Sequence, residues 1–427
     1  MRNVDAAGLG IGDDHPPRIM GVLNVSEESP YDPSVYDDPG EAAAYVDEEL
    51  IGEGADIVDV GLESANKDLD VLSAEQELER LDTAIETLES TSGDAVWSIE
   101  TRYHEVADEA LSRGFDMVND ICGFADPEMP RVCREHDAAV SKMASPPDLE
   151  RPGAIEDVDD IYEALSMNGL TDKTILDPAF GGWSEAKTHE DDRETFHRLR
   201  EFRGYGRPLL VSINRKSFLK TIAGRSTEEA LPVSLAATSM AVERGAHVIR
   251  THDVAETRDA ALVGAEFARD RHRSAADPDA VTVEELDVTT VREAERHLDR
   301  IGAPEATAGP DGERDDARNA VVRTYELSGL DDPAVGALRA ATVGGDAAGA
   351  AFALGDPNRA SAATTPSATD GGTGGSGGPA PAADGPEGDR RGLLIGTPAA
   401  IDSVREAVTG VSAPLDAALD GIDRDVS

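Results

Sequence analysis

Apolar runs rich in β-branched residues alternate with segments of helical period from Arg18 to about Asp270. Eight such runs occur: RIMGVLNV, DIVDVGL, AVWSIE, DMVNDI, AAVSKM, TILDPAF, PLLVSIN and HVIRTH. Between them lie segments whose apolar residues recur at helical spacing, such as residues 41–54, 74–90 and 232–245. Near-continuous apolar strands that alternate with helices are typical of a parallel sheet covered by helices.

Eight strand–helix units within about 250 residues fit the size of a (β/α)8 TIM barrel, an α/β fold that we expect over residues 17–275. An open, doubly wound sheet is the competing architecture, but no glycine-rich dinucleotide motif follows the first run. Residues 1–16 lack the apolar core of a signal peptide, and we expect them to form a flexible tail.

A second, small α/β domain is predicted at residues 281–356 and 391–412, where VVRTYEL, AAGAAFAL and LLIG read as strands. TVREAERHLDRIG reads as a helix, with Thr289 or Thr290 as its N-cap and Gly302 as its C-cap. Residues 357–390 are low in complexity and rich in glycine, so they are expected to form a disordered insertion. Residues 413–427 are expected to form an acidic tail.

The composition narrows the classes of partner. The formal net charge is −47, from 86 Asp+Glu against 39 Lys+Arg, so nucleic acid and anionic membranes are not expected to bind. The acidic residues are interleaved with regular apolar runs, which indicates a folded, halophilic protein in which salt screens self-repulsion. No run approaches the ~20 apolar residues of a membrane span. We therefore expect a cytoplasmic protein, since the sequence shows neither a signal peptide nor a membrane span. Cys122 and Cys133 fit neither a disulfide framework nor a zinc site.

Polar residues gather where the predicted strands end. Any one of them could merely cap a helix or solvate a loop. In a TIM barrel, however, the carboxyl ends of all strands meet at one rim, where active sites lie. Seven of the eight predicted strands end in such residues, among them Asn24, Glu63, Glu100, Asn119, Asp177, Asn214, Lys216, Arg250 and His252. The sequence therefore predicts a site at this rim.

The residue types at this rim indicate the kind of ligand. Carboxylates and amides suit a flat heterocycle with N–H donors, because a carboxylate can accept two hydrogen bonds at once. Lys216, Arg250 and His252 are the cations of this set. Arg250 and His252 share one face of a strand, and this pairing suits an anion such as phosphate. Asn24 could give one oxygen to a single Mg²⁺ ion.

Lysine is scarce in this chain, with six among the 39 Lys+Arg, yet Arg215 and Lys216 stand side by side in SINRKSFL. We interpret Arg215 as a structural cation that pairs with neighbouring carboxylates. Lys216 is then the residue that faces the ligand, because its compact ammonium fits against a heterocycle where a planar guanidinium does not.

Several motifs resemble those of dihydropteroate synthases, in the same order along the chain. IMGVLNVSEES is similar to I-M-G-I-L-N-V-T-x-D-S, and GADIVDVGLES to G-A-x-I-I-D-V-G-G-E-S. SIET, VNDI, LDPAFG, SINRKSF and GAHVIRTHDV continue the resemblance over residues 17–270. The C-terminal segments resemble an accessory domain found beside this synthase in some chains. The resemblance implies a TIM barrel and a transferase of folate biosynthesis, which joins 4-aminobenzoate to 6-hydroxymethyl-7,8-dihydropterin diphosphate and releases diphosphate.

The resemblance also implies roles for individual residues. The pterin would be bound by Glu100, Asn119, Asp177 and Lys216, and the diphosphate by Asn24, Arg250 and His252. Mg²⁺ would be the cofactor, with Asn24 as a ligand. Ser217 and Lys67 would lie beside the aminobenzoate. Lys216, Asp177, Arg250 and His252 would be the catalytic residues, in a protein that forms a homodimer.

The chain departs from the family pattern at a few positions. The third strand carries Glu100 where the family has Asp, and the second loop has Lys67 near the place of an arginine. Lys187 aligns with the family lysine of D-P-G-x-G-F-x-K-T only with a short insertion. These changes leave two alternatives: a pterin enzyme that uses another arylamine, as in a methanopterin-type pathway, or a non-catalytic pterin-binding protein.

Overall fold

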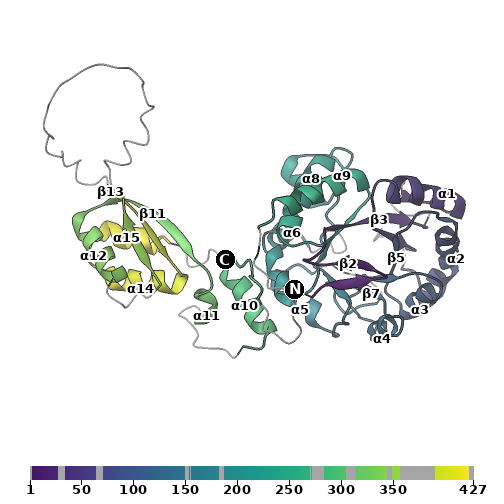
Figure 1. The fold of residues 1–427 in the computed structure, drawn as a ribbon, viewed down its shortest axis with the longest axis horizontal. Helices are drawn as coiled ribbons and strands as arrows, with labels where there is room; N and C mark the ends of the chain where they lie inside the picture. Colours follow the sequence, from purple (N-terminus) through teal and green to yellow (C-terminus); the bar gives the residue numbers. More distant parts are fainter. Residues whose placement is uncertain are drawn as a thin grey trace, which may run out of the picture. The chain divides into compact units, whose positions relative to one another are not determined.

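The chain forms two compact units in the computed structural model, Met1–Glu285 and Leu286–Ser427 (Figure 1). The structure describes residues 2–26, 34–63, 71–149, 153, 155–181, 187–269, 271, 283–303, 314–343, 349–355 and 390–422. Each unit has its own hydrophobic core. The predicted insertion at residues 357–390 and the loop with Lys67 lie outside the described residues, except for Arg390.

The first unit is the predicted (β/α)8 barrel. All eight predicted strands are present and parallel, in the order β8-β7-β6-β5-β4-β3-β10-β9. The barrel closes between β8 and β9, which stand at the two ends of this order. There Leu176 forms a parallel bridge to Leu209, the residue before β9. The strands are β3 Arg18–Asn24, β4 Ile57–Gly61, β5 Val96–Thr101, β6 Met117–Asp120, β7 Ala139–Met143, β8 Thr174–Asp177, β9 Leu210–Val211 and β10 Val248–Thr251. Their side chains are almost all buried, as expected when helices cover the outer face.

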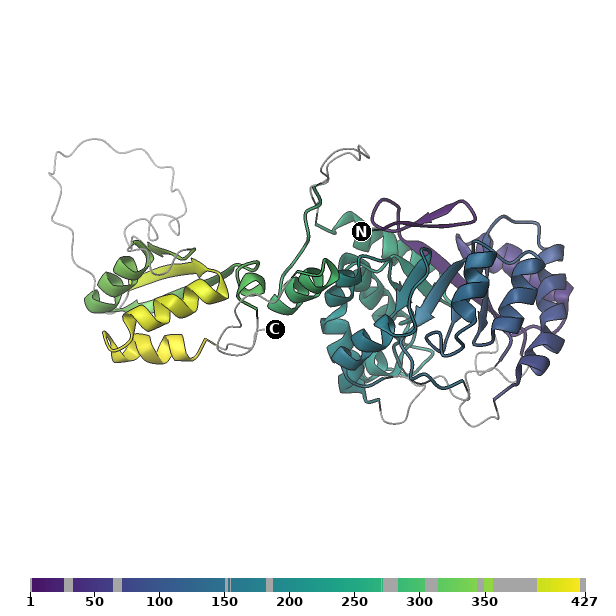
Figure 2. The same cartoon turned by 90° about the horizontal axis from the view of Figure 1, so that it is seen from below.

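Helices surround this sheet (Figure 2). The segment predicted at residues 41–54 forms a short α-helix that continues directly as a π-helix, η2 Val46–Ile51. α2 begins after Ser73, which forms a capping box with Gln76. The helical elements are α1 Pro39–Tyr45, α2 Ala74–Ser90, α3 His104–Ser112, α4 Met129–Glu135, α5 Val158–Ser166, α6 His189–His197, the 3-10 helix η3 Leu199–Tyr205, α7 Ser217–Ala223, α8 Leu231–Glu243 and α9 Val254–Glu266.

The N-terminal residues form a hairpin, which corrects the prediction of a flexible tail at residues 1–16. β1 Val4–Ala6 pairs antiparallel with β2 Leu9–Ile11. Val4, Ala6 and Ile11 are buried in one cluster with residues from the amino-terminal parts of the barrel strands, such as Met20 and Ile57. The hairpin, purple in Figure 2, therefore covers the amino-terminal end of the barrel with apolar side chains.

The second unit begins at Leu286 and contains an antiparallel sheet of order β11-β13-β12. Thr290 is the N-cap of α10, with a capping box to Glu293, which resolves the predicted choice between two threonines. The elements are α10 Val291–Arg300, α11 Asp315–Arg318, β11 Arg323–Leu330, α12 Asp332–Val343, β12 Ala351–Leu354, β13 Arg390–Gly396, α14 Pro398–Val408 and α15 Ala413–Asp420.

The predicted acidic tail at residues 413–427 is wrong in its first part, because α15 buries Leu415 and Leu419 in the core of this unit. None of the helices that the structure describes is long and apolar enough to cross a membrane.

Candidate active site

A cavity of about 290 Å³ opens at the carboxyl ends of the barrel strands. Six of the residues expected to bind a ligand line it, so the structure brings these predicted side chains together. The cavity is lined by Val22, Glu100, Asn119, Ile121, Met143, Asp177, Ala179, Phe180, Ser212, Asn214, Lys216, Arg250, Thr251 and His252.

Arg250 joins two carboxylates at this cavity. Its Nε donates to Asp59 Oδ2 at 2.7 Å, and its Nη2 donates to Glu100 Oε2 at 2.7 Å. Asp59 also accepts hydrogen bonds from Asn119 Nδ2 at 3.0 Å and from Ser98 Oγ at 2.7 Å. Burial would lower the pKa of Arg250, but the charges of Glu100 and Asp59 outweigh it and raise that pKa. The guanidinium is thus a fixed cation.

Asp59 was not among the predicted site residues. It is fully buried in β4 and holds both Arg250 and Asn119. A signal was available, because Asp59 is a carboxylate in the middle of the apolar run DIVDVGL, and a buried carboxylate needs partners. Asp59 lies in the middle of its strand, whereas ligand contacts are expected at the strand ends.

The two carboxylates predicted to bind the pterin hold protons more tightly than usual. Burial raises the pKa of Asp177 to about 6, although the Ala179 N–H that donates to its Oδ1 at 2.8 Å acts in the opposite sense. Burial also raises the pKa of Glu100, against the positive charge of Arg250. Both groups therefore keep their protons to a higher pH than a solvated carboxyl does.

Lys216 lies in the N-cap position of α7 with an extended backbone. Burial, with the charge of Arg250 next, lowers the pKa of its ammonium. Its aliphatic chain passes over Gly181, where an added Cβ would lie 2.9 Å from Lys216 Cδ. Lys216 therefore lies against the backbone that follows Asp177, with its side chain in the cavity wall.

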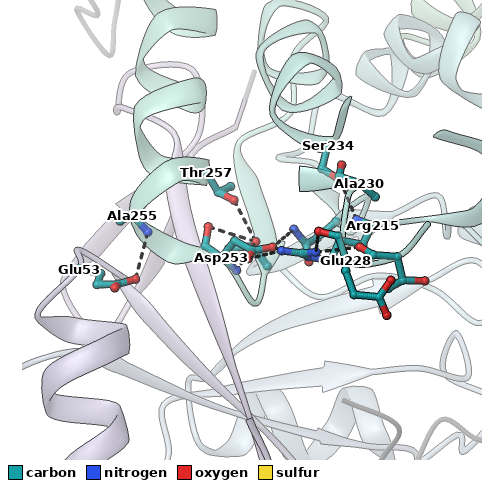
Figure 3. A network of polar contacts seen from close by, with 11 residues as sticks. Glu53, Arg215, Glu228, Ala230, Ser234, Asp253, Ala255 and Thr257 are labelled. Carbon is teal, nitrogen blue, oxygen red and sulfur yellow. Dashed lines mark hydrogen bonds and ion pairs between the residues drawn. The ribbon is translucent and has the colours of Figure 1, made fainter. Parts of the chain in front are cut away.

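Arg215, next in sequence, has the structural role expected of it. Its guanidinium donates to both oxygens of Asp253 at 2.8 Å, and its Nη1 donates to the carbonyl of Thr227 at 2.7 Å (Figure 3). The backbone N of Arg215 donates to Ser234 Oγ at 2.8 Å. This bond helps to hold Arg215 at a φ of 51°, which is unusual for a residue other than glycine. Asp253 also accepts from Asn214 Nδ2 at 2.9 Å.

His252 lines the cavity but is not the cation expected from the sequence. Burial, together with the charge of Arg250, lowers its pKa to about 3. The imidazole is therefore neutral at pH 7 in the ligand-free protein. It can donate one hydrogen bond to an anion, while the neighbouring Arg250 carries positive charge.

The remaining predicted residues lie elsewhere. Asn24 is at the end of β3, where its Nδ2 donates to Ser34 Oγ at 2.9 Å. Its Oδ1 faces Gly61, where an added Cβ would lie 2.9 Å from Asn24 Oδ1 and 3.9 Å from Glu100 Oε1. Ser217 is exposed at the start of α7 and does not line the cavity. Lys67 lies outside the described residues.

Comparisons with known proteins agree with this geometry. The family described as "Pterin binding enzyme" matches residues 20–252. The dihydropteroate synthase of Bacillus subtilis is 31% identical over 242 residues, which cover 55% of this chain and 83% of that protein. The dihydropteroate synthase of Escherichia coli K12 is 30% identical over 271 residues, covering 60% of this chain and 94% of that protein.

One relative is a much longer protein. It is the probable bifunctional folylpolyglutamate synthase/dihydropteroate synthase of Halobacterium salinarum, 33% identical over 250 residues. This match covers 56% of this chain and only 30% of that protein.

Two solved structures are similar to the barrel. A dihydropteroate synthase from Coxiella burnetii in complex with pteroic acid aligns with a TM-score of 0.53 and 28% identity, over 62% of this chain and 98% of that one. The synthase of Xanthomonas albilineans with 4-aminobenzoic acid aligns with a TM-score of 0.52 and 29% identity, over 61% of this chain and 96% of that one.

Proposed function

Given that the chain belongs to the pterin binding enzyme family, we propose that it is a dihydropteroate synthase. As such it transfers the dihydropterin-methyl group from 6-hydroxymethyl-7,8-dihydropterin diphosphate to 4-aminobenzoate. The observation that carries this proposal is the cavity in which Asp177, Asn119 and Glu100 lie together with Lys216 and Arg250. Acceptors for N–H groups and donors for an anion thus line the same cavity.

We assign the pterin to the Asp177 side of this cavity. A pterin presents amino and ring N–H donors along one edge, which a carboxylate can accept in pairs. Its carbonyl oxygen and ring nitrogen are acceptors, which suit the donors of Lys216. Glu100 is one methylene longer than the family's aspartate, and its bond to Arg250 keeps its carboxylate beside the guanidinium. We therefore expect Glu100 to act on the pterin and on the diphosphate side together.

Arg250 and His252 are the proposed contacts of the departing diphosphate. The bonds of Arg250 to Asp59 and Glu100 use its Nε and Nη2. The guanidinium has five N–H donors, so further donors can bind phosphate oxygens. When the C–O bond at the pterin methylene breaks, its electron pair leaves with the diphosphate, and a nearby fixed cation stabilises that charge. The amine nitrogen of 4-aminobenzoate forms the new C–N bond and loses a proton.

Mg²⁺ is the proposed cofactor, and Asn24 the protein residue that would hold it. The amide nitrogen of Asn24 is already bonded to Ser34, so its oxygen is the end turned toward Gly61 and the Glu100 side. An amide oxygen is a ligand that Mg²⁺ accepts, usually together with substrate phosphates and water. The ion would supply additional positive charge for the diphosphate. Ser217 and Lys67 remain the proposed neighbours of the aminobenzoate.

Turnover at high salt tests this function. The purified full chain is incubated with the dihydropterin diphosphate, Mg²⁺ and 4-aminobenzoate, and released diphosphate and dihydropteroate are measured. Release of both supports the proposal. Release only with a different arylamine would favour a methanopterin-type reaction, and pterin binding without release would favour a non-catalytic role. His252→Ala should mainly impair steps that involve the diphosphate.

We further propose that the protein is a cytoplasmic homodimer adapted to high salt. Cys122 and Cys133 are buried free thiols, which fit a reducing compartment. The helices α8 and α9 expose large apolar side chains, including Met240, Leu262 and Val263, as expected of a surface that a second copy covers. Size-exclusion chromatography with light scattering measures the assembly state.

A further inference from the structure

Lys187 is a buried lysine outside the cavity that is bonded to backbone lining the cavity, at Ala179. Lys187 Nζ donates to the carbonyl of Ala179 at 2.9 Å and lies 3.6 Å from Asp192 Oδ1. Only 1% of the Lys187 side chain is exposed. Asp192 Oδ1 also accepts from the backbone N of Gly181 at 3.0 Å. The ammonium and the carboxylate thus hold the backbone on both sides of Phe180.

This backbone has an unfavourable conformation that needs such support. Ala179 has a φ of 60°, in the left-handed region that residues other than glycine avoid. That conformation is unfavourable for an alanine, and it persists only where the surroundings impose it. Its N–H donates to Asp177 Oδ1 at 2.8 Å and its carbonyl accepts from Lys187, so both of its polar groups are held.

Two predicted catalytic residues depend on this conformation. The Ala179 N–H binds one oxygen of Asp177 and so fixes the orientation of a carboxylate in the cavity wall. Gly181, with a φ of 85°, supports the aliphatic chain of Lys216, which leaves no room for a Cβ there. A relaxed Ala179 would release Asp177 and move the surface on which Lys216 lies.

We propose that Lys187 and Asp192 are positioning residues for dihydropteroate synthesis. They hold the Ala179–Gly181 backbone in its strained conformation, and through it they orient Asp177 and Lys216 toward the pterin. Lys187 acts through the backbone rather than on the substrate, since it does not line the cavity. This inference rests on the proposed function.

The test compares Lys187→Met with a matched control in the full chain. Lys173→Met is that control, because Lys173 Nζ also donates to the carbonyl of a non-glycine residue with positive φ, Asp137, at 2.7 Å. Lys173, however, precedes β8 at the amino-terminal end of the barrel. Binding of the dihydropterin diphosphate is measured by calorimetry, and KM and kcat by turnover. We expect Lys187→Met to weaken pterin binding about tenfold or more, and Lys173→Met to leave it unchanged.

A second substitution separates positioning from general stability. In the Lys187→Met background, Ala179→Gly should recover most of the lost pterin affinity, because glycine adopts positive φ without the steric penalty. Thermal unfolding of each variant is measured in parallel. Unchanged pterin affinity in Lys187→Met overturns the inference, as does a loss that follows the melting temperature and is not recovered by Ala179→Gly. If the wild type neither binds pterin nor turns over, the proposed function fails and this inference with it. If the wild type turns over and the pterin affinity of the variants is unchanged, only the positioning role of Lys187 and Asp192 is contradicted.

Discussion

Lys216 and Arg215 are neighbours in sequence with different environments. Arg215 is bonded to Asp253 and to backbone carbonyls, whereas Lys216 lies in the cavity wall with a lowered pKa. We expect Lys216→Ala to weaken pterin binding about 10- to 100-fold, because a hydrogen bond to a charged group contributes about 1.5–3 kcal/mol. Calorimetric titration with the pterin measures this loss.

The control for Lys216 is the lysine one turn further along α7. Lys220 Nζ donates to Thr227 Oγ1 at 2.9 Å on the outside of the site. Lys220→Ala should bind the pterin as the wild type does. An equal loss of affinity in both variants would mean that the positive charge of this helix, and not the contact of Lys216, attracts the ligand.

Asp177 should make pterin binding depend on pH. Its pKa is about 6, and only the ionised carboxylate accepts two N–H donors. Binding should therefore be strongest above pH 6 and weaken by up to tenfold per pH unit as the pH falls below it. Dissociation constants measured from pH 4.5 to 8 check the expected inflection. Asp177→Asn should bind weakly and lack it, and an inflection that survives in this variant would belong to another group, such as Glu100.

At the level of single residues, the sequence located the residues that line the cavity better than the residues that hold them in place. Asp177, Asn119 and Lys216 were predictable because barrel topology brings strand ends together. The roles of Asp59 and Lys187 are less apparent from the sequence, because they depend on which groups these side chains bond. The neutral state of His252 likewise depends on burial beside Arg250, which spacing along the chain does not reveal.

Among the structural elements, the N-terminal hairpin is one that the sequence missed, as is α15. The strands of the hairpin are only three residues long, too short for an alternating pattern to stand out. The eight barrel strands were predictable because continuous apolar runs reflect burial on both faces. The role of the hairpin becomes clear only in the structure, where it covers the apolar residues at the amino-terminal end of the barrel.

Asp13 should be the main polar link between this hairpin and the barrel. Its carboxylate accepts hydrogen bonds from His247 Nε2 at 3.0 Å and from Arg271 Nη2 at 2.9 Å, and Arg203 Nη2 lies 3.4 Å away. Burial alone would raise the pKa of Asp13, but the His247 hydrogen bond and the charge of Arg203 outweigh it and hold that pKa well below its usual range. We expect Asp13→Asn to lower the free energy of unfolding by about 3–5 kcal/mol, the usual loss when one partner of a buried ion pair is removed.

Urea unfolding at several pH values measures this contribution. Because the pKa of Asp13 is lower in the folded than in the unfolded state, its stabilisation is complete above the usual aspartate pKa of about 4 and declines as the pH falls below it. The difference between wild type and Asp13→Asn should therefore be large at pH 7 and shrink toward pH 3. Asp14→Asn, at the exposed next position, should change little. A difference that does not depend on pH would contradict an ionic role.

For the whole molecule, the two units and the acidic charge were predictable from composition and pattern. The second unit starts and ends later than the sequence suggested, since a terminal helix with few apolar residues resembles a tail until its partners are known. The acidic net charge has a consequence for the stability of the folded chain.

Salt should stabilise the folded chain. A net charge of −47 makes carboxylates repel one another across the surface, and folding brings them closer together. Raising the ionic strength from 0.1 to 1 M shortens the Debye length from about 10 to about 3 Å, which screens that repulsion. We expect a gain of at least about 1 kcal/mol, or roughly 2–4 °C in the melting temperature of a domain of this size. Thermal unfolding in KCl and NaCl at equal ionic strength, with sucrose as a neutral control, measures it. A melting temperature that falls with KCl would show that attractive ion pairs, such as that of Arg250 with Glu100, outweigh the repulsion.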